Sequence, residues 1–310
     1  MAKRVSAVKQ GRAVRGGGKQ GRAVRGGGKQ GGGLRVADPA GTGPGMTERD
    51  DEKKGRGLRG RAGRMRGGRG SGRTGAGQVR FWGRHAVEAA LLNPERVHRK
   101  LWATREGVAS LDGELPADFT VEYASVVDLA RLVARDAPHQ GLVLDCAPLE
   151  ELSLDDLPPA DPARPIVVLD QVTDPHNLGA ILRSAAAFNA AAIITQDRHA
   201  PPESGTVAKA ASGALEIVPW VRVVNLSRAL EDLAEAGYWR IGLDGAASAL
   251  FGAVLQSGPI ALVLGAEGEG LRQNVAGHCD VLARLPIAAA MESLNVSNAA
   301  AVALYAMAVR

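Results

Sequence analysis

Three segments place polar side chains at the ends of predicted strands, where ligands of α/β proteins bind. The first, residues 169–188 (LDQVTDPHNLGAILRSAAAF), contains Asn177 and Arg183. Arg183 lies off the apolar stripe of the predicted helix and shares a helix face with His176 and Gly179. Its guanidinium and the Asn177 amide suit an anionic or ribose-bearing ligand. A surface charge and a turn residue are the alternative, and the pattern alone leaves both open.

The second segment, residues 262–271 (LVLGAEGEGL), is a predicted strand that runs into Gly265, Gly268 and Gly270. Glycines at such a position let the backbone approach a ligand closely. Glu267 and Glu269 would repel a phosphate, and the spacing is neither GxGxxG nor a P-loop. The segment therefore favours a ligand other than a nucleotide phosphate, and an ordinary strand-to-helix turn is the alternative.

The third segment, residues 285–310, starts its helix with a polar cluster that includes Ser293 and Asn295, as helix caps do. The helix that follows is apolar nearly all round, so it must be buried on several sides. We expect residues 293–310, including Met307, to be buried in the interface of a homodimer.

These segments resemble a known family. DPHNLGAILRSA, LGAEGEGL and LPIAAAMESLNVSNAAAVAL look like the three signature motifs of the SpoU-type (TrmH-like) RNA ribose 2′-O-methyltransferases of the SPOUT class, in the family's order. This resemblance covers residues 165–310. Residues 80–147, with GRHAVEAALLNPERVHRKLWAT and HQGLVL, are similar to the small substrate-binding domain of the 23S rRNA (guanosine-2′-O-)-methyltransferase subgroup.

The resemblance implies a trefoil-knotted α/β fold, which is a rare exception to unknotted chain connectivity. It also implies S-adenosylmethionine as the cofactor, bent in the knot, and an active site formed between two subunits. The cofactor contacts carried over by position are Gly265, Leu285 and Leu294. The catalytic residues carried over are Asn177, Arg183, Glu267, Ser293 and Asn295.

The implied reaction is attack of a ribose 2′-OH on the sulfonium methyl group. Because an arginine keeps its proton in proteins, we expect Arg183 to hold an RNA phosphate or to stabilise the developing alkoxide rather than to act as a base. Asn177, Ser293 and Asn295 would position the ribose and the cofactor, and Glu267 would orient Arg183 or the loop.

The expected substrate is RNA, with a guanosine of 23S rRNA as the target, because the simplest tRNA enzymes of the family lack the small N-terminal domain. A tRNA ribose 2′-O-methyltransferase is one alternative. A non-catalytic RNA-binding or ribosome-assembly factor is the other.

The elements that must position these residues are a parallel sheet and its helices. Short apolar runs predict strands over 165–170, 191–195, 238–244, 259–265 and 280–287, in a sheet covered on both faces. We expect a small α/β substrate-binding domain over 79–147, an acidic, Pro-rich linker over 148–164 and the catalytic domain over 165–310.

The charge is divided unevenly along the chain. Residues 1–78 hold 20 Lys and Arg against 5 Asp and Glu, a net charge of +15, and include a ten-residue repeat at 11–20 and 21–30. Residues 79–310 carry a net charge of −10. We expect the Gly/Arg-rich segment to be a disordered basic tail that binds RNA, and a tail without function is the alternative.

The composition excludes other classes of protein. Cys146 and Cys279 fit no CxxC spacing, and no metal site is expected. Apolar runs are too short for a membrane span, and the N-terminus has no apolar signal region. These features predict a cytoplasmic protein without a membrane partner.

Overall fold

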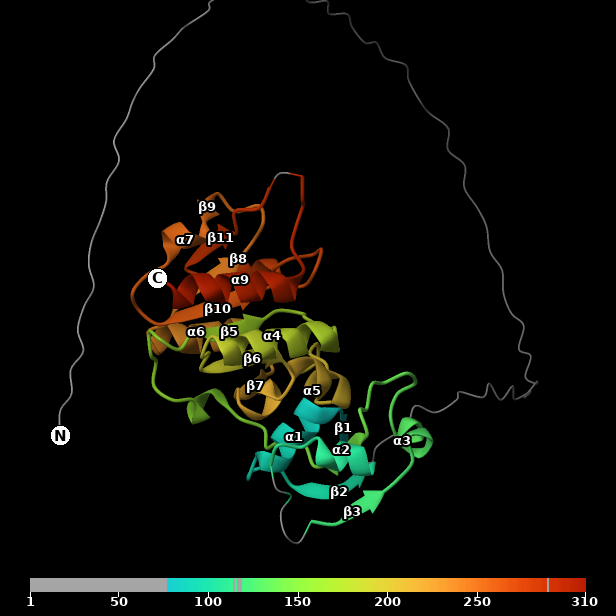
Figure 1. Cartoon of the computed structure of the whole chain (residues 1–310). Coiled ribbons are helices and arrows are strands. Elements are labelled where there is room, and N and C mark those ends of the chain that lie inside the picture. Colours follow the sequence, from blue (N-terminus) through green and yellow to red (C-terminus); the bar gives the residue numbers. More distant parts are fainter. Residues whose placement is uncertain (1–76, 114, 116–118, 289) are drawn as a thin grey trace, which may run out of the picture. The chain divides into compact units, whose positions relative to one another are not determined.

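The structure is a computed structural model that describes residues 77–113, 115, 119–288 and 290–310. Up to residue 76, the basic tail predicted over 1–78 lies outside the described residues. The described residues belong to one structural unit and form two sheets, which are shown with their helices in Figure 1.

The first sheet has four strands in the order β1-β4-β2-β3. Strand β4 is antiparallel to both of its neighbours, whereas β2 and β3 are parallel. The helix α1 packs on this sheet through Val87 and Ala90, which are fully buried with Phe81 and Leu144. The elements are β1 Val79–Trp82, α1 Arg84–Leu92, β2 His98–Ala103, α2 Arg105–Ala109, β3 Val121–Tyr123, α3 Val126–Leu132 and β4 Leu142–Cys146.

The second sheet has seven strands in the order β7-β6-β5-β10-β8-β11-β9, and all of its strand pairs are parallel. The predicted α/β class is therefore confirmed, and five of the strands match predicted ones. The sequence patterns did not reveal β7 and β9. The strands are β5 Ile166–Leu169, β6 Ala192–Gln196, β7 Trp220–Val223, β8 Trp239–Leu243, β9 Ala249–Leu250, β10 Ile260–Leu264 and β11 Val281–Arg284.

Helices cover both faces of this sheet, which explains why its central strands read as unbroken apolar runs. The helices α4, α5 and α9 share a core with residues such as Val167 and Leu262, and α6 and α8 pack on the opposite face with Val168 and Val263. The helices are α4 Pro175–Ala187, α5 Gly205–Ala211, α6 Leu226–Glu235, α7 Phe251–Val254, α8 Gln273–Ala276 and α9 Val296–Ala308, with short 3-10 helices at Leu154–Asp156 and Ala214–Glu216.

The terminal helix α9 differs from its prediction. It lies beside α4 (Figure 1) and buries Ala300, Ala303, Leu304 and Met307 in the core of its own chain. Met307 is only 6% exposed, so its burial needs no second subunit. The large apolar side chains of α9 that remain exposed are Val302 and Tyr305, at 47% and 58% exposure. The expectation that Met307 lies in a dimer interface was wrong, because the core of a single chain already encloses it.

The two sheets are joined through a buried ion cluster. The guanidinium of Arg96, which has no exposed side-chain surface, lies 2.5 Å from Glu203 Oε1 and 2.6 Å from Glu216 Oε1. Burial raises the pKa of the Glu203 carboxyl above its ordinary value, against the opposing effect of the Arg96 charge. A Cβ on Gly205 would lie 2.0 Å from the Trp82 ring, so only glycine lets α5 approach β1 this closely.

Both cysteines are free. Burial raises the pKa of each thiol, Cys146 and Cys279, to about 12. Among the residues that the structure describes, no helix is long and apolar enough to span a membrane.

Candidate active site

The N-terminus of α4 forms one side of the candidate site. The Asp174 carboxylate accepts a hydrogen bond from the His176 backbone N–H at 2.9 Å, and Pro175 takes the first helical position. Both are preferred at helix starts, because a carboxylate satisfies a free N–H and proline has none to satisfy. This cap places Asn177 in the first turn of α4.

The rest of α4 presents one face to the core. Leu178, Ile181 and Leu182 are fully buried and Arg183 is exposed, as the apolar stripe predicted. Gly179 is different, because it is buried where a Cβ would lie 2.4 Å from the Cβ of Ala210 on α5. Gly179 therefore serves a close helix–helix approach and does not share an open face with Arg183.

The N-terminus of α9 forms the second side. Asn295 caps this helix, and its Oδ1 accepts hydrogen bonds from the backbone N–H groups of Ser297 at 2.9 Å and Asn298 at 3.4 Å. The capping role expected for this polar cluster is confirmed. Because the oxygen is used for the cap, the Nδ2 group of Asn295 is left to donate elsewhere.

The carboxylate of Glu267 joins the three sequence segments. Its Oε1 accepts hydrogen bonds from Asn177 Nδ2 at 3.2 Å, from the Val296 backbone N–H at 3.3 Å and from Asn295 Nδ2. Asn295 Nδ2 also donates to Asn177 Oδ1 at 3.0 Å. A carboxylate at a helix N-terminus is favoured both by the free N–H groups and by the helix dipole.

Glu267 does not orient Arg183, which was one of the two roles expected for it. Its hydrogen-bond partners are the two asparagines and the backbone of α9. Within the described part of the chain, Arg183 takes part in no hydrogen bond or ion pair. Its guanidinium is thus available to a ligand from outside the chain.

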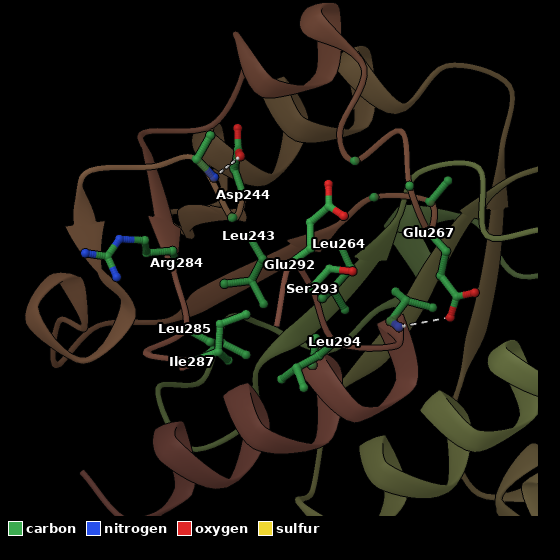
Figure 2. A pocket seen from close by; sticks show the side chains of 18 of the residues that line it. Leu243, Asp244, Leu264, Glu267, Arg284, Leu285, Ile287, Glu292, Ser293 and Leu294 are labelled. Carbon is green, nitrogen blue, oxygen red and sulfur yellow. Dashed lines mark hydrogen bonds between the residues drawn. The ribbon is translucent and has the colours of Figure 1, made fainter. Parts of the chain in front are cut away.

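A cavity of about 850 Å³ opens beside this cluster, at the carboxyl ends of β8, β10 and β11. Figure 2 shows Glu267, Leu285, Ser293 and Leu294 around it, and Gly265 also lines it. Asn177 and Asn295 do not line the cavity but bind Glu267 at its edge. Arg183 is not part of the lining either. Five of the eight predicted site residues therefore surround one cavity, two adjoin it, and Arg183 stands apart on α4.

The lining also contains residues that the sequence patterns did not single out. Asp244 follows β8 and accepts a hydrogen bond from the Ala246 backbone N–H at 2.8 Å, while Arg284 ends β11 (Figure 2). Asp244 ends a predicted strand, which is the signal that could have found it, whereas Arg284 lies inside the strand predicted over 280–287. Glu292 of the loop before α9 adds a further carboxylate.

The loop at residues 265–271, named here the cofactor loop, folds back on itself. A Cβ on Gly265 would lie 2.1 Å from the carbonyl carbon of Gly270, and the Gly270 N–H donates to the Ala266 carbonyl at 3.0 Å. Gly268 and Gly270 have φ values of 84° and 69°, which favour glycine. Close backbone approach at Gly265 was expected towards a ligand, and the structure shows it towards the loop's own backbone.

The residues that line the cavity fit S-adenosylmethionine. Pockets for ligands of this size enclose roughly 300–1,000 Å³, and this cavity lies within that range. Its acidic side chains Asp244, Glu267, Glu269 and Glu292 suit a ligand that carries a sulfonium and an ammonium cation and no phosphate.

Two family models match the chain. The SpoU rRNA Methylase family matches residues 164–305, and the model for RNA 2′-O ribose methyltransferase substrate binding matches residues 81–152. The first match contains all strands of the seven-stranded sheet, and the second contains the four-stranded sheet except the first two residues of β1.

Individual relatives agree with these models. The 23S rRNA (guanosine-2′-O-)-methyltransferase RlmB of Pseudomonas aeruginosa is 38% identical over 234 residues, which are 73% of this chain and 94% of that protein. The uncharacterized tRNA/rRNA methyltransferase slr0955 of Synechocystis is 41% identical over 236 residues, which are 72% of this chain, and the chain spans 60% of that relative's length.

Among solved structures, the AdoMet-bound rRNA methyltransferase of Sinorhizobium meliloti superposes with a TM-score of 0.61 at 25% identity, over 74% of this chain and 86% of that one. The motifs, the cavity and these similarities lead to one conclusion. The chain belongs to the SpoU rRNA methylase family and is an RNA ribose 2′-O-methyltransferase that uses S-adenosylmethionine.

Proposed function

We propose that this protein methylates the ribose 2′-OH of a guanosine in 23S rRNA. The observation that carries the proposal is the meeting of Asn177, Glu267 and Asn295, one from each segment, at the edge of the cavity. The choice of nucleotide and RNA follows the names of RlmB relatives, three of which the chain matches over 94% of their length.

The residues proposed to hold the cofactor are Gly265, Leu285 and Leu294, which all line the cavity. S-adenosylmethionine supplies an electrophilic methyl group when it is bound there. Apolar side chains beside backbone groups suit its adenosine part, and the carboxylates of the lining suit its cationic end.

The chain's own residues would orient the hydroxyl that attacks. Glu267 fixes the two asparagine amides by accepting from both, and Ser293 lines the cavity. We assign Asn177, Ser293 and Asn295 to placing the ribose and the cofactor. Holding two reactants in line lowers the entropic part of the barrier, so positioning can supply much of the rate.

Arg183 is assigned to the RNA. Its guanidinium keeps its proton, so it would bind a phosphate or stabilise the alkoxide that develops as the 2′-OH attacks. The exposed position of Arg183 on α4 and its lack of a partner in the described chain support contact with RNA. An arginine that already closed an ion pair within the chain would be less available for this role.

The domain assignments are part of the proposal. Residues 79–147 would bind the RNA substrate, 148–164 would link this domain to the catalytic domain at 165–310, and 1–78 would be an RNA-binding tail. The linker packs through Leu152, Leu154 and Leu157 on the core at the α6 and α8 face of the seven-stranded sheet, which supports a fixed connection.

We also propose a cytoplasmic homodimer with a trefoil-knotted catalytic domain. Strand β10 lies between β5 and β8 in the sheet, although both precede it in the chain. The insertion of a late strand between two earlier strands supports a knot. The open apolar side chains Val302 and Tyr305 on α9 support a self-association surface there.

The test of the function is analysis of methylated nucleosides in RNA from a strain that lacks this protein. We expect 23S rRNA to lose one 2′-O-methylguanosine, and the wild-type chain to restore it. Loss of a methylated nucleoside from tRNA with 23S rRNA unchanged would contradict the proposal.

The same strain tests Arg183. We expect Arg183→Ala to restore less than about one hundredth of the methylation rate, by the usual effect of removing one preorganised charged donor. The matched control is Arg228→Ala, because Arg228 is an exposed arginine on α6, on the opposite face of the sheet. Full complementation by Arg183→Ala would refute the assigned role.

A further inference from the structure

Asp170 and Arg272 bind the two ends of the cofactor loop to each other. We propose that this pair, named here the clasp, holds the cofactor loop closed and thereby positions Glu267 for methyl transfer. The inference rests on the proposed function, and both members act as positioning residues because neither lines the cavity.

Asp170 directly follows β5 and is fully buried. Its backbone N–H donates to the carbonyl of Leu264, the residue before the loop, at 2.8 Å. Its Oδ2 accepts from the backbone N–H of Arg272, the residue after the loop, at 2.9 Å. One buried residue therefore binds the chain on both sides of residues 265–271.

The side chain of Arg272 completes the clasp. Its Nε donates to Asp170 Oδ1 at 2.8 Å, and its Nη2 lies 2.6 Å from the same oxygen. Nη2 also donates to Gln196 Oε1 at 2.8 Å, at the end of β6. A guanidinium offers several donors in a rigid plane, so it can bridge these groups, whereas a lysine ammonium cannot reproduce the arrangement.

The clasp controls both sides of the contact at Glu267. Glu267 projects from the closed loop, and Asn177 follows Asp170 by one short segment that begins with Gln171 at a φ of 57°. Asp170 thus anchors both the segment that carries Glu267 and the segment that carries Asn177, which donates a hydrogen bond to Glu267. Opening the clasp should shift both relative to α9.

The complete burial of the Asp170 carboxylate explains why it needs Arg272. An ionised carboxylate without exposed surface requires a charged partner and hydrogen bonds. Arg272 supplies both, and its side chain is 38% exposed. The requirement to neutralise Asp170 therefore fixes the position of Arg272, where the chain leaves the cofactor loop.

The test is Arg272→Lys, which keeps the charge and removes the planar set of donors. The matched control is Arg240→Lys. Arg240 binds Asp280 in the same manner, through its backbone N–H at 2.8 Å, its Nε at 3.0 Å and its Nη2 at 2.6 Å, where β8 and β11 begin. That pair does not line the cavity.

We expect Arg272→Lys to weaken S-adenosylmethionine binding about tenfold by calorimetry, a change of roughly 1.4 kcal/mol. We also expect faster hydrogen exchange of the amides in residues 266–270, and a lower kcat at saturating cofactor and RNA. Arg240→Lys should change none of these at a temperature where both variants are folded. Unchanged cofactor affinity and exchange in Arg272→Lys, or equal losses in both variants, would overturn the clasp.

Cofactor binding and exchange need no RNA, so they separate this inference from the proposed function. If the wild-type protein binds the cofactor but does not methylate 23S rRNA, the proposed function fails while these two readouts still decide the clasp. Asp170→Asn provides a second variant of similar shape, and we expect it to produce the same losses.

Discussion

At the scale of single residues, the motifs predicted side chains that lie together in the structure, but not all of their partners. Asn177, Glu267 and Asn295 were all expected at the site, and the structure brings them together. The contact between Asn177 and Glu267 was not predictable from local patterns, because it depends on β5 and β10 being neighbours in the sheet. Asp170 and Arg272 were missed for a similar reason, since their pairing joins the end of β5 to the residue after the cofactor loop.

Gly265 gives a sharp test at this scale. A Cβ there would meet the backbone of Gly270 at 2.1 Å and Leu271 N at 2.4 Å, and backbone cannot move aside as a flexible side chain can. We expect Gly265→Ala to open the cofactor loop and to weaken S-adenosylmethionine binding at least tenfold, which calorimetry would measure.

The control for that substitution is Gly258→Ala, because a Cβ on Gly258 would meet nothing within 4 Å. We expect this variant to bind the cofactor as the wild type does. Normal binding by Gly265→Ala would mean that the loop relaxes without affecting the cavity.

At the scale of elements, buried strands and the capped helix α4 were predictable because their patterns are local. The strand β7 was missed because it lies at the sheet edge, where only Val221 is fully buried and Arg222 interrupts the apolar run. The strand β9 has two residues, too few for a pattern. Helix α9 was recognised as apolar, but its composition could not show which side chains the chain itself buries.

The exposed face of α9 allows a test of the proposed dimer. We expect Val302→Asp to shift the protein from dimer to monomer in light scattering while circular dichroism stays unchanged, because an unpaired charge would be buried only in the assembly. Met307→Asp should instead unfold the chain, since Met307 lies in the core.

Val224→Asp is the control for the same measurement, because Val224 is 78% exposed and follows the edge strand β7. It should remain a dimer. A wild-type protein that is monomeric and well folded at micromolar concentration would contradict the proposed dimer.

At the scale of the whole molecule, composition shows how charge is distributed along the chain but could not reveal how the sheets are joined. Arg96, Glu203 and Glu216 are of residue types that are mostly exposed, yet they form a buried cluster between the two sheets. A buried charge is stable only with its partners, and those partners lie far apart in the sequence. The charge pattern of a sequence therefore predicts exposed side chains even where the fold buries them.

The remaining question at this scale is how an acidic folded part meets RNA. Residues 79–310 carry a net charge of −10 and residues 1–78 carry +15. If the tail recruits RNA electrostatically, binding releases counterions, and log K should fall against log salt with a slope of about −0.7 for each single-strand phosphate neutralised. Deleting residues 1–78 should weaken RNA binding and flatten this slope.

The deletion should leave S-adenosylmethionine affinity unchanged, because the proposed cofactor contacts all lie within residues 265–294. A salt titration of RNA binding by the full chain and by the truncated chain measures the difference, and cofactor calorimetry serves as its internal control. Equal affinities and equal slopes for the two proteins would mean that residues 79–310 recruit the RNA. In that case exposed cations such as Arg183 would have to neutralise the phosphates, and Arg183→Ala would reduce the slope by about one phosphate, as expected for a single contact.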